Sequence, residues 1–262
     1  MAEERAVPFR GGGFAPRSIR FAGLAVLVAV LAIWQLGSSE GWISPILVPS
    51  PYEVMLALWR LIVTGELFGH LLASLQRLLI GSALGMSFGI AVGISAGIFS
   101  LARSTGLPVV AALYPVPKIA LLPLFILWFG IGEPSKIATI AFGTFFPMVI
   151  ATAGGVDAVD RSLIRMGQSF GLSPWQIVRS IILPATLPAV LPGLRIAAST
   201  GIVLLVAAEM IGAREGLGAF VLLAGNLMAT DRLLAGVVVL SMLGLVIAAC
   251  IGWLERKLLA WR

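Results

Sequence analysis

Residues 78–102 read LLIGSALGMSFGIAVGISAGIFSLA, a run of 25 residues without a charged side chain between Arg77 and Arg103. About 20 apolar residues in a helix cross the hydrocarbon core of a bilayer, so this stretch predicts a transmembrane helix. Glycine recurs at every fourth position from Gly81 to Gly97, which lines one helix face with glycine and lets another helix approach closely. That helix either packs within the same chain or belongs to a partner and slides along this face.

Five further stretches have a similar length and hydropathy, and together they predict six spans and an all-α membrane protein. Three are uncharged and two are interrupted by one cation each; they are Phe21–Ser39, Ser104–Gly132 (Lys118), Ile137–Val156, Ser180–Ala208 (Arg195) and Leu233–Leu254. The first is alternatively a cleaved signal peptide, although no clear small-x-small cleavage site follows it.

The composition supports the same class of protein. Of 262 residues, 59% are hydrophobic and 11% are charged, whereas soluble domains carry about 25% charged residues. One cysteine and one histidine are too few for a disulfide framework or a multi-ligand metal cage, so we expect no metal site. The net charge of +6 comes from short basic clusters between apolar runs, which indicates a membrane surface and no nucleic acid partner.

The basic residues also predict an orientation. With six spans both termini share one side, which holds eleven cations: Arg5, Arg10, Arg17, Arg20, Arg103, Arg161, Arg165, Arg179, Arg256, Lys257 and Arg262. The opposite side holds four, namely Arg60, Lys136, Arg214 and Arg232. The positive-inside rule therefore predicts cytoplasmic termini, with residues 1–20 as a cytoplasmic segment ahead of a transmembrane domain at 21–262.

The third span contains Pro108, Pro115, Pro117 and Pro123, and it carries Lys118. Proline frees backbone carbonyls, which membrane helices tolerate where protein or a water-filled cavity satisfies them, so we expect a broken helix. Charges inside a membrane favour a functional role, and Lys118, Arg195 and Glu209 are therefore candidate substrate-pathway residues. Alternatively, Lys118 and Arg195 extend to the interface, or Arg195 forms a structural pair.

Residues 157–184, between the fourth and fifth spans, are too polar to cross a membrane, and we call them the capped loop. Asp160 is expected to cap a helix over Arg161–Phe170 that ends at Gly171. Ser173-Pro174-Trp175-Gln176 predicts a second capped helix that stops at Pro184. Of the apolar residues on the first helix, Met166 and Phe170 are expected to pack against the spans.

The capped loop resembles a loop of ABC-transporter permease subunits, E-A-A-x-x-x-G-x(9)-I-x-L-P. Gly171, nine residues and Ile181-Ile182-Leu183-Pro184 match that pattern, whereas Arg165-Met166-Gly167 stands where Glu-Ala-Ala is usual. Other segments are similar to the branch that imports aliphatic sulfonates, taurine, nitrate and bicarbonate: 47–51 (LVPSP), 115–118 (PVPK), 121–136 (LLPLFILWFGIGEPSK), 208–212 (AEMIG), 216–218 (GLG) and 254–256 (LER).

The resemblance implies the fold of a type I ABC importer permease in the inner membrane. It implies a homodimer with two ATP-binding subunits and an external solute-binding protein. It also implies that the capped loop docks on the ATP-binding subunit, with the candidate coupling residues Asp160, Arg165, Gly167, Ser169, Phe170, Gly171, Leu172 and Trp175.

The chain has no G-x-x-x-x-G-K-[ST] phosphate loop, so we expect no catalytic residue and no cofactor on this chain, with ATP and Mg on the partner subunit. The expected solute is a small anion, for which Lys118 and Arg195 would supply positive potential. Alternatives are a permease for another small organic acid or heterocycle, an ion-driven carrier that uses Glu209, a membrane scaffold and an intramembrane enzyme. An intramembrane serine protease would need a base, usually histidine, inside its spans, and the one histidine of this chain lies outside the predicted spans.

Overall fold

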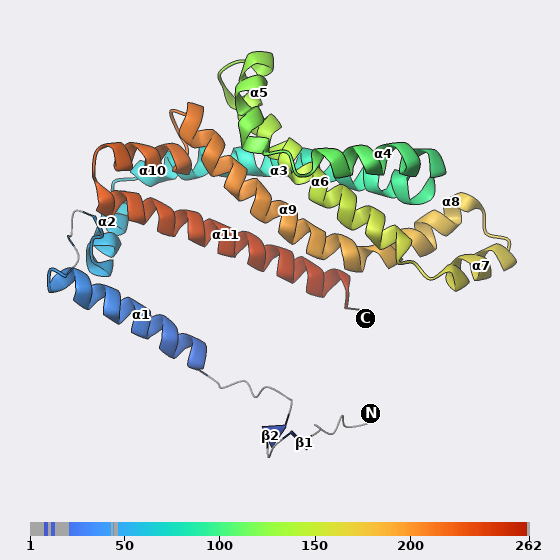
Figure 1. The fold of residues 1–262 in the computed structure, drawn as a ribbon, viewed down its shortest axis with the longest axis horizontal. Helices are drawn as coiled ribbons and strands as arrows, with labels where there is room; N and C mark the ends of the chain where they lie inside the picture. The colour runs from blue at the N-terminus through green and yellow to red at the C-terminus, as the bar shows by residue number, and fades with distance from the viewer. Residues whose placement is uncertain (1–7, 10–11, 14–20, 43, 45–46, 261–262) are drawn as a thin grey trace.

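The computed structural model describes residues 8–9, 12–13, 21–42, 44 and 47–260, and these form an elongated bundle of helices (Figure 1). The helices are α1 (Ala22–Ser39), α2 (Pro51–Val63), α3 (Glu66–Ile98), α4 (Ser100–Leu113), η1 (Lys118–Leu121), α5 (Leu122–Phe129), α6 (Glu133–Asp157), α7 (Arg161–Ser169), α8 (Pro174–Ile177), a π-helical turn η2 (Val178–Ile182), α9 (Leu183–Gly212), α10 (Leu217–Asn226) and α11 (Thr230–Leu258). Two short strands, β1 (Pro8–Phe9) and β2 (Gly12–Gly13), pair antiparallel. The remainder of the expected cytoplasmic segment 1–20 lies outside the described residues.

The spans agree with the sequence prediction. Within the described residues, five helices are long and apolar enough to cross a membrane: α1, α3, α6, the continuous helix Pro174–Gly212, and α11. Counted as one broken span, the pair of α4 and η1–α5 makes a sixth, and it is bent by 92° at the segment that holds Pro115 and Pro117, as expected for a proline-broken helix. The second predicted span lies in a longer helix. Helix α3 begins at Glu66 and includes the polar turns ahead of Leu78.

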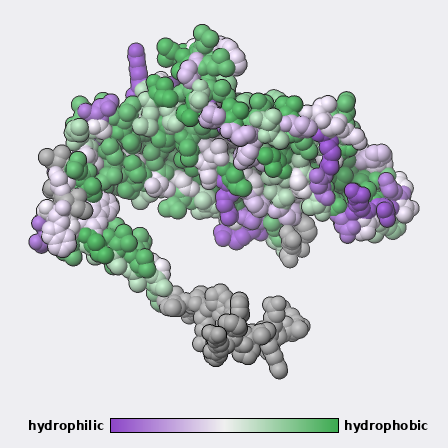
Figure 2. Space-filling model, in the orientation of Figure 1, coloured by the Kyte–Doolittle hydropathy of each residue, from purple (hydrophilic) through white to green (hydrophobic). Residues whose placement is uncertain are grey.

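The surface has the character of a membrane protein. Hydrophobic residues cover most of the helix bundle, while hydrophilic residues gather at the end that carries α7 and α8 (Figure 2). Large apolar side chains such as Leu127, Val203 and Leu245 are two-thirds exposed or more. These surfaces are suited to lipid or to other transmembrane helices.

The two ends of the bundle differ. At one end, which we call the loop end, α6 leads into the capped loop and α9 leaves it. At the opposite end, which we call the far end, α2 and α10 pack around the starts of α3 and α11 (Figure 1). Helix α1 extends away from the bundle and contacts α2, and Trp34 Nε1 donates a hydrogen bond at 3.1 Å to Pro49 O, just ahead of α2.

The glycine row of α3 packs against α6 of the same chain. A Cβ added at Gly81 would lie 2.8 Å from Ile140 Cβ, and one at Gly93 would lie 2.6 Å from Thr152 Cβ. Contacts advance by equal steps along both helices, so α3 and α6 run parallel with their backbones close together. The structure therefore supports packing of the glycine face within one subunit and not against the helix of a partner.

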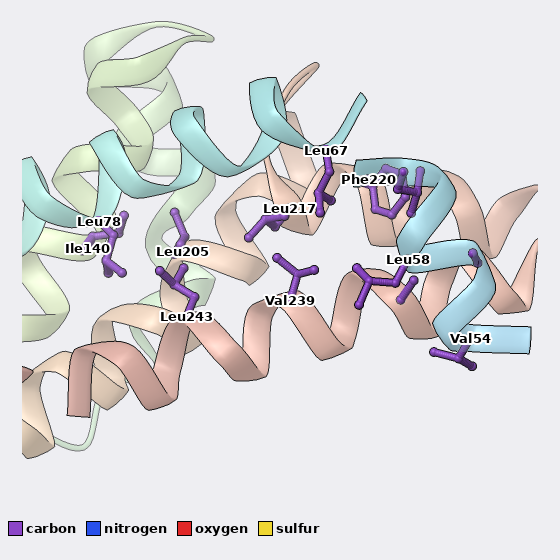
Figure 3. Packing of buried hydrophobic residues seen from close by; sticks show 13 residues of the cluster. Val54, Leu58, Leu67, Leu78, Ile140, Leu205, Leu217, Phe220, Val239 and Leu243 are labelled. Atoms are coloured by element: carbon purple, nitrogen blue, oxygen red, sulfur yellow. The ribbon is translucent and has the colours of Figure 1, made fainter. Parts of the chain in front are cut away.

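A second layer of packing fills the far end. Buried apolar side chains of α2, α3, α9, α10 and α11 converge there, among them Val54, Leu67, Leu205, Leu217 and Val239 (Figure 3). Helix α9 also packs along α6, so α6 is enclosed between α3 and α9. This arrangement fixes the relative positions of the two ends.

Replacing Gly85 with alanine tests the α3–α6 contact. The new methyl group would overlap the Ala141 carbonyl oxygen and the Thr144 hydroxyl, so we expect a loss of about 1–3 kcal/mol of stability. The measurement is the melting temperature of the purified protein in detergent. Gly154→Ala on α6 is the matched control, since its Cβ has no neighbour within 4 Å and alanine favours helix by about 1 kcal/mol. Equal melting temperatures for the two variants would contradict the close contact.

Candidate functional site

The first helix of the capped loop forms as its sequence predicts. Asp160 caps α7, and its Oδ1 accepts a hydrogen bond from the backbone N–H of Ser162 at 2.8 Å, which lowers the pKa of the Asp160 carboxyl below its ordinary value. At the other end Gly171 has φ +72°, the left-handed conformation that glycine adopts without strain. The Gly171 N–H donates to Gln168 O and the Leu172 N–H to Gly167 O, which closes the helix as a Schellman motif.

The second helix is capped as predicted, but it does not stop at Pro184. Ser173 and Gln176 form a capping box at the start of α8, with Pro174 in the first turn. The chain then continues through the π-helical turn into α9 as one helix, Pro174–Gly212. A π-helical turn widens the backbone just ahead of Pro184, where a regular helix would place the proline ring against the carbonyl of Ser180. The predicted stop is therefore wrong.

The capped loop is attached to the bundle by apolar contacts. Val156, Val159, Ile177 and Ile182 form a buried cluster beneath α7 and α8. Gly167 is buried against it, and a Cβ there would lie 2.8 Å from Ile181 Cδ1. The small residue expected at this position is thus required by the packing of α7 on the following helix.

The outer face of the capped loop exposes large side chains. Phe170 is 79% exposed, Trp175 is 70% exposed and Met166 is 50% exposed. The expectation that Met166 and Phe170 pack against the spans is wrong, because α7 turns its small residue Gly167 toward the bundle. Arg165 and Ser169 are also exposed, and Leu172 is half-buried beside Gly167. The arrangement is a capped protrusion with an aromatic tip.

The three predicted pathway residues lie in separate environments. Lys118, at the bend between α4 and η1, donates to the Tyr114 carbonyl and lies over the Tyr114 and Phe146 rings, 4.7 and 5.3 Å from their centroids. Arg195 of α9 is 54% exposed and pairs with Glu255 of α11 at 2.8 Å. Glu209 lies near the far end of α9 with no exposed surface.

Glu209 is the centre of a buried network. Its carboxylate accepts hydrogen bonds from Ser74 Oγ at 2.7 Å, Arg77 Nη1 at 2.7 Å and the Gly218 N–H at 2.8 Å. Arg77 also makes a two-pronged ion pair with Glu133 at the start of α6. Four helices, α3, α6, α9 and α10, are joined through these groups.

The same face of α3 binds the chain that links α9 to α10. His70 Nδ1 accepts from the Gly216 N–H at 3.1 Å, Ser74 Oγ accepts from the Leu217 N–H at 2.8 Å, and Arg77 Nη1 donates to Glu215 O at 2.6 Å. A Cβ at Gly216 would overlap the Glu209 carboxyl group, so the backbone here approaches the network as closely as glycine allows.

Comparison with known proteins identifies the class. Residues 85–260 match the family described as "Binding-protein-dependent transport system inner membrane component". The chain belongs to this family. It is 40% identical to SsuC of Escherichia coli K12, named as an aliphatic sulfonates transport permease protein, over 93% of this chain and 92% of that protein. It is 37% identical to the taurine transport system permease protein TauC of the same organism, over 91% of this chain and 88% of that protein.

Two further comparisons extend this result. The chain is 36% identical to the riboflavin transport system permease protein RibX of Chloroflexus aurantiacus, over 91% of this chain and 90% of that protein. An inward-facing structure of the MetNI methionine ABC transporter has the same fold, with a TM-score of 0.62 and 22% identity over 73% of this chain and 95% of that one. The protein is therefore a multi-pass inner-membrane permease of an ABC importer, and ATP hydrolysis occurs on a separate subunit.

Sequence reasoning did not assign three buried groups of the permease to a site, namely Arg77, Ser74 and Lys136, nor their exposed partner Glu133. A signal for the central pair was present. Arg77 directly precedes the uncharged run of the second span, and Glu209 directly follows that of the fifth. Opposite charges at the same depth of two spans are expected to pair.

Breaking the buried pair and an exposed pair should have different effects. Glu209→Gln leaves the Arg77 guanidinium partly uncompensated in a buried site, and we expect a loss of about 3–5 kcal/mol. Glu255→Gln breaks the exposed pair with Arg195 and should cost about 0–1 kcal/mol. Melting temperatures of both variants in detergent check this, and a Glu209→Gln protein as stable as Glu255→Gln would show that the network does not hold the far end together.

Proposed function

We propose that the permease imports a small sulfonate as a homodimer, with an ATP-binding subunit docked on each capped loop and an external binding protein that delivers the solute. The observation that supports the docking is the exposure of Phe170 and Trp175 on a capped loop continuous with α9. ATP and Mg would bind the partner subunit, whose closure would displace the loop and with it the helix that carries Glu209. Each conformation would be favoured by a different nucleotide state.

The proposed orientation places the loop end in the cytoplasm. The positive-inside distribution of Lys and Arg supports it, because Arg103, Arg161, Arg179, Arg256 and Lys257 lie toward this end. The aromatic tip of the capped loop would then face the compartment that holds ATP.

The sulfonate class is supported by the similarity to SsuC and TauC over nearly the whole chain. Nitrate and bicarbonate, the other anions expected from the sequence, have no counterpart among the relatives described above. A heterocyclic solute is the second candidate, favoured by the similarity to RibX.

Within this proposal the pathway candidates take different roles. Lys118 and Arg195 would face the moving solute, since Lys118 lies at the break in a span and Arg195 is half exposed. Glu209 would hold the far end in place, because its carboxylate is already bound by Ser74, Arg77 and Gly218.

Substitution of the aromatic tip tests the docking. Phe170→Ala with Trp175→Ala should reduce co-purification of the ATP-binding subunit by about tenfold or more, since buried aromatic anchors dominate interface energies. The melting temperature of the permease should stay unchanged because both side chains are exposed. Trp253→Ala on α11, which is 57% exposed, is the matched control and should leave co-purification intact. Equal recovery of the ATP-binding subunit with the unmodified permease, the double variant and the Trp253→Ala control would contradict docking at this surface.

A further inference from the structure

A cavity of about 380 Å³ opens at the far end of the bundle, beside the start of α6 and the chain that follows α9. This volume lies within the range of about 300–1,000 Å³ typical of small-molecule sites. Its lining is mostly charged and includes Arg77, Glu133, Lys136, Arg214 and Glu215. None of the residues that sequence analysis assigned to the pathway lines it.

Lys136 is buried with free hydrogen-bonding capacity. Its side chain is 6% exposed, and its Nζ donates to Gly132 O at 3.0 Å. The carboxylate of Glu133 forms an ion pair with it at 3.7 Å, which is longer than a hydrogen bond. An ammonium group has three N–H donors, so two have no acceptor at hydrogen-bond distance among the described residues. Burying such a group is costly unless the occupant of the cavity accepts these hydrogen bonds.

Of the other two cations in the cavity, Arg77 is bound by groups of the protein and Arg214 is available to bind an occupant. Arg77 donates to Glu133, Glu209 and the Glu215 carbonyl, so its guanidinium forms a wall of the cavity. Arg214 is exposed, and within the described part of the chain it forms no ion pair. The cations available to an occupant are therefore Lys136 and Arg214.

The cavity presents charges of both signs. Its lining carries three cations, Arg77, Lys136 and Arg214, and two carboxylates, Glu133 and Glu215. The charge of Arg77 is offset by Glu209 behind the wall, and the Glu215 carboxylate is exposed and unpaired in the same described set. A site with available cations beside an unpaired carboxylate accommodates a molecule that carries both charges, because a bare anion leaves that carboxylate repelling it. The start of α6 adds a partial positive charge on the side of Lys136.

We propose that this cavity is a solute-binding site for an aminosulfonate zwitterion, whose sulfonate binds Lys136 and Arg214 and whose ammonium binds Glu215. The inference rests on the proposed import of sulfonates and narrows it to solutes with a cationic group. It places the first contact of the solute with the permease at the far end, away from Lys118 and Arg195.

Two probes of similar size, taurine and ethanesulfonate, test the site, since they differ by the ammonium group. Binding of each radiolabelled compound to the purified permease–ATPase complex is measured by equilibrium dialysis without the binding protein. We expect saturable taurine binding and about tenfold weaker binding of ethanesulfonate. Lys136→Gln and Arg214→Gln should each weaken taurine binding about tenfold, and Lys136→Arg should restore part of it. Glu215→Gln should lower the affinity for taurine to that for ethanesulfonate.

Arg60→Gln is the matched control, because Arg60 is an exposed cation at the far end that lines a different cavity. It should leave the binding of both probes unchanged. The proposal is overturned if the unmodified complex shows no saturable taurine binding, if both probes bind equally, or if Arg60→Gln weakens binding as much as Arg214→Gln. Arg214→Gln removes an exposed side chain, so it keeps the test decisive if Lys136→Gln fails to fold. Failure here with intact co-purification of the ATP-binding subunit would leave the proposed docking unaffected.

Discussion

The close contact between α3 and α6 is the constraint on which the rest of the structure depends. Glycine at every fourth position of α3 brings two long parallel helices together, and α9 packs on the other side of α6. In lipid no hydrophobic force drives helices together, so close van der Waals packing of small residues must do so. The three helices form one body that connects the buried network of the far end to the capped loop of the loop end.

The continuity of α8, η2 and α9 connects the two ends of this body. The capped loop and Glu209 lie at opposite ends of a single helix, Pro174–Gly212, so the proposed displacement of the loop would act on the helix that carries Glu209. Glu209 holds α3 through Ser74 and Arg77, and Arg77 holds the start of α6 through Glu133. The π-helical turn and Pro184 lie at the base of the loop, where the regular hydrogen-bond ladder is interrupted. Covalent and charged connections therefore join the capped loop to the far end.

Local signals in the sequence predicted most of the fold. The spans follow from the length of uncharged runs, and the caps at Asp160, Gly171 and Ser173 follow from residue types that act on the backbone close to them in the chain. The continuation of the helix past Pro184 was not predictable, because it depends on a π-helical turn that no residue pattern announces. The outward position of Phe170 depends on which face of α7 meets the bundle. In the network around Glu209, opposite charges at the ends of two uncharged runs indicate the pair with Arg77. The bond from Ser74, 135 residues away, follows from helix packing alone.

The central claim is that the capped loop is held by the ATP-binding subunit on the cytoplasmic side. The direct measurement is the reactivity of a cysteine at position 170, as Phe170→Cys with the native exposed cysteine replaced by Cys250→Ser, toward a membrane-impermeant maleimide. The account predicts no labelling in intact cells, labelling in inside-out vesicles stripped of the ATP-binding subunit, and protection when that subunit is added back. Labelling from outside intact cells, or labelling that the subunit does not diminish, would contradict it.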